Sequence, residues 1–248
     1  MKRLNKIQIS RIRSLSKTRS LNYISRELGI QKTVVYYWCR KLLGRKMKKV
    51  KFNPSLREEL GEIIGIFASD GSFIKDRKYT YKIRIHLSSD EYEYSLRIKK
   101  LFENVFGKPG RIYTNKAKNM FIFEVFGKRI IEIFHDYIDW DHGKKTYTIR
   151  LSYPLKKYDK YFLQGFIRGL FNRDGWISIK NAGFGSVSGN LIKNVKQILN
   201  TYNIRYGHRS YIPKNKHMYH MLNIPSSERE KLVRTFKLKN MLPMGVPS

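Results

Sequence analysis

Two acidic residues at matched places in the chain predict a site for a divalent cation. Asp70 and Asp174 each end a mostly apolar segment, and a glycine follows each of them. The first segment reads GEIIGIFASDG from residue 61 and the second reads GFIRGLFNRDG from residue 165. Gly, Gly, Phe, Asp and Gly recur in them with an offset of 104 residues. Five matching residue types at one spacing indicate an internal duplication.

Both segments are predicted to be helices, and the first is apolar almost all round, which is typical of a buried helix. A carboxylate at a helix C-terminus lies at the negative end of the helix dipole, and two such ends side by side repel each other. A divalent cation reverses this effect, because carboxylates and free backbone carbonyls are hard oxygen ligands. We expect Mg²⁺, replaceable by Mn²⁺ or Ca²⁺, on the carboxylates of Asp70 and Asp174 and the carbonyls of Gly71 and Gly175.

Four glycines inside the two segments predict a close contact between the helices. Each glycine costs roughly 1 kcal/mol relative to alanine in a helix interior, so four cost about 4 kcal/mol. Close approach of two backbones offsets that cost, because glycine has no side chain. We therefore expect the helices to pack with Gly65 against Gly169 about a pseudo-twofold axis.

The ends of both helices carry recognisable signals. Ser55 followed by Glu58 predicts a capping box at the start of the first helix, and Asp159 is the expected N-cap of the second. Gly71 and Gly175 suit the left-handed residue that closes a helix.

The segments Ile63–Gly71 and Ile167–Gly175 resemble the two motifs of single-chain LAGLIDADG homing endonucleases, and the resemblance extends over about residues 54–240. In that family the last acidic residue of each motif binds the catalytic metal, which assigns this role to Asp70 and Asp174. An earlier family aspartate, which is not the metal ligand, is replaced here by Ala68 and Asn172.

The resemblance implies a metal-dependent endonuclease that cuts one DNA strand with each motif. It also implies an active-site lysine after each half: Lys144 or Lys145, with Lys145 preferred, and Lys237 or Lys239, with Lys239 preferred. The expected substrate is double-stranded DNA with a long, partly asymmetric target, and the protein is expected to act as a monomer. The resemblance implies an intron-encoded gene, with a free-standing gene as the alternative. Relatives that act as transcription regulators, or as splicing maturases that bind RNA, leave a non-cleaving alternative open.

The charge balance points to the same class of partner. The 248 residues hold 51 Lys and Arg against 19 Asp and Glu, a formal net charge of +32. Such an excess indicates binding to a polyanion, and nucleic acid is the first choice. A membrane surface is the weaker alternative, because no basic helix with a wide apolar face stands out. The single cysteine, Cys39, excludes an internal disulfide and fits an intracellular protein.

Residues 1–50 are expected to form a separate helix-turn-helix unit and linker. They hold 15 Lys and Arg against one acid, Glu27. Residues 20–42 read as helix, glycine turn at Gly29 and helix, with Val34, Trp38 and Leu42 on the inner face of the second helix. A basic bundle that packs on the rest of the protein is the alternative. The residues expected to read DNA are Gln31, Lys32, Thr33, Tyr36 and Tyr37.

The remainder is expected to be an α+β protein of two pseudo-symmetric halves, residues 51–150 and 151–248. The pattern of each half predicts the order αββαββα, because period-2 segments alternate with amphipathic helices. Each half then gives an antiparallel four-stranded sheet, and the two sheets form a DNA-binding saddle. The face of each sheet that points to solvent is called its wet face. Basic residues on these faces and in the hairpin turns are the expected DNA contacts: Lys82, Arg84, His86, Arg111, Lys116, Lys180, Arg209 and Lys214.

Overall fold

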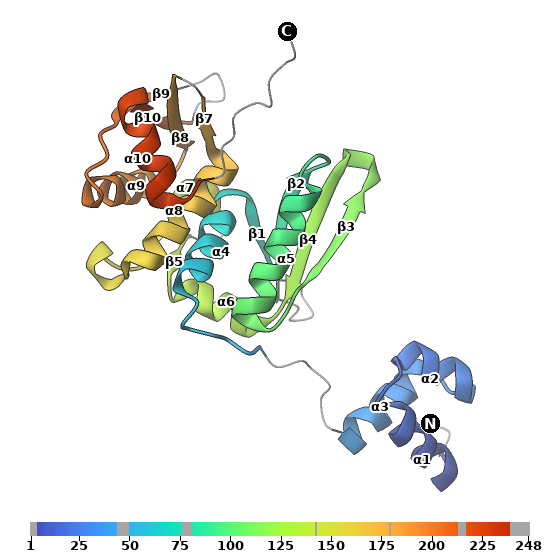
Figure 1. Ribbon diagram of the computed structural model, residues 1–248. Coiled ribbons are helices and arrows are strands. Elements are labelled where there is room, and N and C mark those ends of the chain that lie inside the picture. The colour runs from blue at the N-terminus through green and yellow to red at the C-terminus, as the bar shows by residue number, and fades with distance from the viewer. Residues whose placement is uncertain are drawn as a thin grey trace. The chain divides into compact units, whose positions relative to one another are not determined.

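The computed structural model describes residues 4–43, 50–75, 81–141, 143–178, 180–212 and 217–238. The chain forms two compact units, Met1–Lys49 and Val50–Ser248 (Figure 1). No helix in the described ranges is long and apolar enough to cross a bilayer. Of the predicted site residues, the DNA contact Lys214 and the active-site lysine Lys239 lie outside the described residues, as does the side chain of Lys116.

The first unit is a three-helix bundle of α1 (Lys6–Leu15), α2 (Leu21–Leu28) and α3 (Lys32–Leu43). Gly29 ends α2 in the left-handed conformation, with φ +60°, as predicted for the turn before α3. The inner face of α3 is rotated from the predicted one, because Val35 and Cys39 are fully enclosed with Ile12 and Ile24. Val34, Trp38 and Leu42 flank this centre and are only partly buried.

The second unit confirms the predicted order αββαββα in both halves. The first half consists of α4 (Arg57–Asp70), β1 (Gly71–Lys75), β2 (Tyr81–Ser88), α5 (Tyr92–Phe106), β3 (Arg111–Asn115), β4 (Met120–Phe126) and α6 (Lys128–His135). The second consists of α8 (Lys160–Asp174), β7 (Gly175–Ile177), β8 (Asn181–Ser186), α9 (Gly189–Thr201), β9 (Gly207–Tyr211), β10 (Tyr219–Pro225) and α10 (Ser226–Phe236). Between them lie β5 (Ile138–Asp139), α7 (Lys145–Thr148) and β6 (Arg150–Leu151), which were not predicted.

The two sheets have the same antiparallel topology. Their strand orders are β1-β2-β4-β3 and β7-β8-β10-β9, so the second strand of each half lies in the interior of its sheet. Within β2, Ile83, Ile85 and Leu87 face the core, and the residues between them face away from it. The alternation fixes one wet face on each sheet, because side chains on a strand point to opposite faces in turn.

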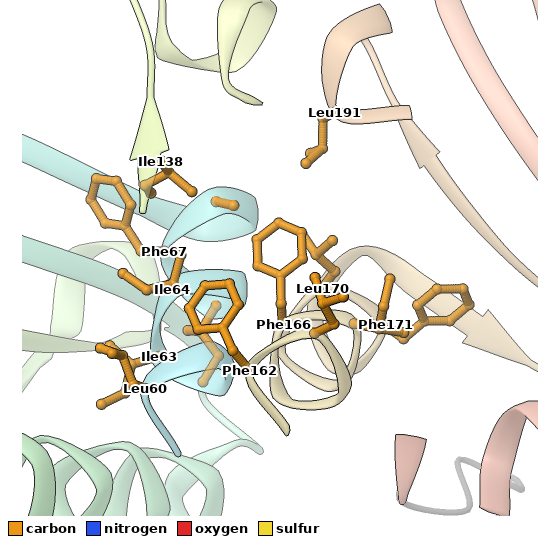
Figure 2. Close-up of a cluster of buried hydrophobic side chains, with 14 of the residues drawn as sticks. Leu60, Ile63, Ile64, Phe67, Ile138, Phe162, Phe166, Leu170, Phe171 and Leu191 are labelled. Atoms are coloured by element: carbon orange, nitrogen blue, oxygen red, sulfur yellow. The ribbon is translucent and has the colours of Figure 1, made fainter. Parts of the chain in front are cut away.

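Helices α4 and α8 pack backbone to backbone at the centre of the second unit (Figure 2). A Cβ atom built on Gly65 would lie 2.2 Å from the carbonyl oxygen of Phe166 and 3.0 Å from the Cα of Gly169. One built on Gly165 would lie 1.9 Å from the carbonyl oxygen of Glu58. The predicted glycine contact is therefore confirmed, and large apolar side chains close around it: Leu60, Ile63, Ile64, Phe67, Phe162, Phe166, Leu170 and Phe171.

The helix ends agree with the sequence only in part. Asp159 accepts a hydrogen bond from the backbone N–H of Phe162 at 2.9 Å and caps α8 as predicted. The predicted capping box of α4 is wrong: the N-cap is Leu56, whose apolar side chain cannot accept a hydrogen bond, and Glu58 binds Arg168.

The left-handed closure expected of Gly71 and Gly175 is also wrong, since both have extended backbones, with φ −74° and −88°. The chain passes directly from each helix into a strand at these residues. A Cβ there would come within 2.7 Å of the backbone of Phe67 or Phe171, so steric space, not a positive φ, requires glycine.

We expect Gly65→Ala to destabilise the protein by about 3 kcal/mol, the upper end for overpacking, because a methyl group would have to separate two backbones at the centre of the core. Gly207→Ala is the matched control, since a Cβ there would lie 3.9 Å from the carbonyl oxygen of Asn223 and the φ of Gly207 is ordinary. Chemical denaturation of both variants checks this. Equal midpoints for the two variants would contradict the close contact.

Candidate active site and nucleic-acid interface

The C-terminal ends of α4 and α8 bring the two motif acids into one charged cluster. Arg173 precedes Asp174 on α8 and binds the acid of α4: its Nε and Nη2 bind Oδ2 of Asp70 at 2.6 and 2.5 Å. The same guanidinium binds the Glu91 carboxylate and donates to the backbone carbonyl of His86 at 3.1 Å. Because both contacts to Asp70 use Oδ2, its Oδ1 is left to accept a further ligand.

Asp174 lines a hollow of about 260 Å³ together with Ser69, Thr146, Gly185 and Tyr219. Desolvation by the surrounding protein raises the pKa of the Asp174 carboxyl above its usual range, and the nearby Asp70 carboxylate raises it further. The residue keeps a solvent-accessible surface, so this desolvation is partial. A bound cation would stabilise the ionised form of this carboxyl group, because its positive charge offsets both the desolvation and the repulsion by Asp70.

Lys145 lies at the C-terminal end of α4, on the unpredicted helix α7. Its Nζ donates to the backbone carbonyls of Phe67, Ala68 and Ser69 at 2.7, 2.8 and 3.3 Å. Burial lowers the pKa of this ammonium group to about 8, although Asp174 and Asp70 act in the opposite direction. Lys145 thus donates to the last carbonyls of α4, of which that of Phe67 also accepts the backbone N–H of Gly71, and places a positive charge beside the acids.

These residues fit a magnesium site of low protein coordination. In the described residues there is no group of three or more His, Cys, Asp or Glu side chains that could hold a metal ion. Two carboxylates suffice for Mg²⁺ in phosphoryl enzymes, where water and substrate phosphates complete the octahedral shell. Gly71 and Gly175 follow the acids directly and begin β1 and β7.

Of the two candidate active-site lysines of the second half, the structure describes Lys237 and not Lys239. Lys237 Nζ binds both carboxylate oxygens of Glu58, at 3.0 and 3.1 Å. Glu58 is twelve residues before Asp70, which corresponds to about 18 Å along the helix. Lys237 therefore lies at the opposite end of α4 from the acids, and the assignment of Lys239 stays a prediction.

The first sheet carries a basic cluster on its wet face. Lys82, Arg84 and Arg111 surround the fully buried carboxylate of Glu124, with Lys82 Nζ at 3.6 Å and Arg84 Nε at 2.7 Å. Burial alone would raise the pKa of Glu124, but hydrogen bonds from Arg111 and Arg84 hold it below its usual range. His86 lies on the same face, next along β2.

The other predicted contacts occupy exposed positions. Lys180 is exposed in the bend between β7 and β8, and Arg209 is exposed on β9. In the first unit, four predicted base-reading residues are all exposed at or before the first turns of α3: Gln31, Lys32, Thr33 and Tyr36.

Sequence reasoning missed two residues that organise these sites. Arg173 stands beside a motif acid, but only the fold shows that it binds the acid of the other motif. Glu124 interrupts the apolar strand MFIFEVF, and this interruption is the signal that could have marked it. Its three basic partners come from β2 and β3, so only the strand register identifies them.

A family model described as a LAGLIDADG-like domain matches residues 57–139 and 162–237. The chain belongs to the LAGLIDADG family. The matched ranges are the two halves, so the resemblance given by the motifs is confirmed. No curated protein is significantly similar to the chain in sequence.

Solved structures support the LAGLIDADG fold. The I-DmoI complex with DNA and Ca is 15% identical, with a TM-score of 0.56 over 77% of this chain and 95% of that one. The I-DmoI complex with DNA and Mn is 16% identical, with a TM-score of 0.56 over 75% and 99%. Full-length DUF199/WhiA from Thermatoga maritima is 16% identical, with a TM-score of 0.53 over 76% and 58%.

In metal-free buffer we expect opposite effects from neutralising the two acids. Asp174→Asn should raise the melting temperature slightly, because it removes a carboxylate that the nearby Asp70 carboxylate repels. Asp70→Asn should destabilise by ~1 kcal/mol, because the nearly buried Arg173 loses one of its two carboxylate partners. Differential scanning calorimetry with EDTA measures both. Equal shifts of the same sign would contradict the asymmetry described for the site.

Proposed function

We propose that this LAGLIDADG protein is a site-specific endonuclease that hydrolyses both strands of double-stranded DNA and depends on Mg²⁺. The observation that carries the proposal is the convergence of Asp70, Asp174 and Lys145 where α4 and α8 end. The basic wet face of the first sheet supports DNA as the substrate. The two halves lie in one chain, so the proposed active form is a monomer, acting inside the cell.

The chain's residues have distinct roles in the proposed reaction. A bound Mg²⁺ ion would neutralise charge on the scissile phosphate and favour an attacking water molecule. The carboxylates of Asp174 and Asp70 would hold this ion, while Arg173 fixes the Asp70 side chain through Oδ2. Lys145 would stabilise the charge that develops on the phosphate, as an ammonium group close to both acids.

A DNA-binding regulator that does not cleave is the second candidate function. Arg173 favours it, because a guanidinium group already neutralises the acid of the first motif. A maturase that binds RNA would use the same basic surfaces. Cleavage that stops on addition of EDTA would separate the endonuclease from both alternatives.

We expect Asp70→Asn or Asp174→Asn to reduce cleavage by at least a hundredfold, because each removes a metal ligand while DNA binding survives. Lys145→Met should reduce the cleavage rate as well. Lys144→Met is the matched control, since Lys144 is the exposed neighbour and should leave the rate unchanged. Plasmid cleavage against a target from a randomised library measures the rates. Full activity in either acid variant would reject the assignment.

A protein that begins at Val50 should keep metal-dependent cleavage but bind DNA more weakly and cover a shorter footprint. The first unit is compact by itself and contains no carboxylate cluster, so we assign it DNA contact without catalysis. If Gln31, Lys32 or Thr33 reads bases, its removal should also relax preference at one flank by about 1–3 kcal/mol per lost bidentate contact. Footprinting of the full-length and shortened proteins on one target tests this. Identical footprints and affinities would assign residues 1–49 to another task.

A further inference from the structure

The two sheets have the same strand topology, but the side chains on their solvent-facing sides differ in charge and polarity. In the first sheet the wet face gathers three cations around Glu124, as described above. In the second sheet, among the strand residues that the structure describes, Arg209 is the single charged residue on the corresponding face. The rest of that face consists of glycine, aromatic, methionine, asparagine and proline residues: Trp176, Asn181, Gly183, Gly185, Gly207, Tyr211, Tyr219, Met221, Asn223 and Pro225.

Two glycines of β8 leave space for two aromatic rings to pack directly against the backbone of the second sheet. A Cβ on Gly183 would be 2.0 Å from Cζ2 of Trp176, and one on Gly185 would be 2.1 Å from the hydroxyl oxygen of Tyr219. The rings therefore occupy the volume that side chains would otherwise fill. Tyr211 continues this surface, with its ring centroid 5.6 Å from that of Tyr219. The result is an apolar, ring-covered face.

Methionine and asparagine complete this face on the central strand β10. Met221 pairs with Gly185, and Asn223 pairs with Gly183, so both stand between the ring-covered positions and the edge strand β9. Apolar side chains contact the C5 methyl group of thymine, and an asparagine amide matches the edge of adenine in the major groove. These groups suit A·T pairs, and Arg209, which pairs with Met221 on the edge strand, is the single guanidinium on the described strands of this face that could donate to guanine.

The first sheet presents the opposite pattern. Arg84 binds Glu124 through Nε, and Arg111 binds it through Nε and one terminal nitrogen. Since a guanidinium has five N–H donors, each arginine keeps terminal donors free of the carboxylate, although Arg84 also hydrogen-bonds the Tyr113 side chain. Glu124 is buried beneath them, while the Arg111 side chain is 64% exposed. The carboxylate therefore fixes both arginines from below in a position to donate to O6 and N7 of guanine, the usual partner of arginine.

We propose that the two halves read different bases: the first sheet reads guanines, and the second sheet reads thymine methyl groups and adenines. The preferred target then has a G·C-rich half-site under β1-β2-β4-β3 and an A·T-rich half-site under β7-β8-β10-β9. This inference rests on the proposed function, because it specifies the DNA that the same surface binds. It also gives the asymmetry of the target a physical origin in the chain.

Single-atom changes in the DNA test the proposal. After a target is selected from a random library, full-length protein is titrated in Ca²⁺ against duplexes in which one thymine is replaced by uracil or one guanine by 7-deazaguanine. Uracil lacks only the methyl group, and 7-deazaguanine lacks only the N7 acceptor. We expect uracil to weaken binding about fourfold per contacted methyl group, in one half-site only. The 7-deazaguanine penalty should be about tenfold and confined to the other half-site.

Protein variants assign each half-site to its sheet. Met221→Ala should remove the uracil penalty at its contacted position and leave the 7-deazaguanine penalties unchanged, and Arg111→Gln should do the reverse. A selected target with both penalties spread over both half-sites, or with the assignments exchanged, would overturn the split of bases while leaving the proposed function standing. If the library yields no preferred duplex target at all, the proposed function fails and the split fails with it.

Discussion

The contact between the backbones of α4 and α8 is the constraint on which the rest of the second unit depends. Gly61, Gly65, Gly165 and Gly169 place the two helices so close that no added Cβ fits between them. Each acid is the last residue of its helix, so this contact sets where the carboxylates stand. A shift of one helix by a single turn would move one carboxylate by about 5.4 Å and separate the pair. The geometry of the site is thus a property of rigid helices.

Buried charges fix the register of the same contact. Glu62, with no exposed surface, binds Arg97 of α5 through both carboxylate oxygens and Arg168 of α8 at 2.8 Å. Removing one partner of a buried pair typically costs 3–5 kcal/mol, because the remaining charge is uncompensated. Glycine contacts alone would tolerate neighbouring registers, whereas these pairs form only when Glu62 lies opposite Arg168. They also join the first half's outer helix to the second half's central one.

Most of the fold could be predicted from the duplicated motif, because glycine spacing and apolar periodicity are local signals. Asp70 and Asp174 followed from the same repeat. The partners of Arg173 and Glu124 could not be predicted, since each depends on strand register or on contacts between halves. The one-residue rotation of α3, from Val34 to Val35, shows a further limit: a period of 3.6 residues fits two adjacent faces of a short helix almost equally well. Helix α7 has only four residues and carries no periodic signal.

The charge pairs across α4 and α8 also decide whether either half could pair with a second copy of itself. The residue that matches Arg168 in the first motif is Ile64, and the residue that matches Glu62 in the second is Phe166. Two copies of the first half would leave Glu62 facing isoleucine, and two copies of the second would enclose Arg168 beside phenylalanine. Either symmetric pair therefore buries an ion that lacks its partner across the axis. The two halves of this chain are therefore not interchangeable, because each supplies the buried charge that the other needs across the axis.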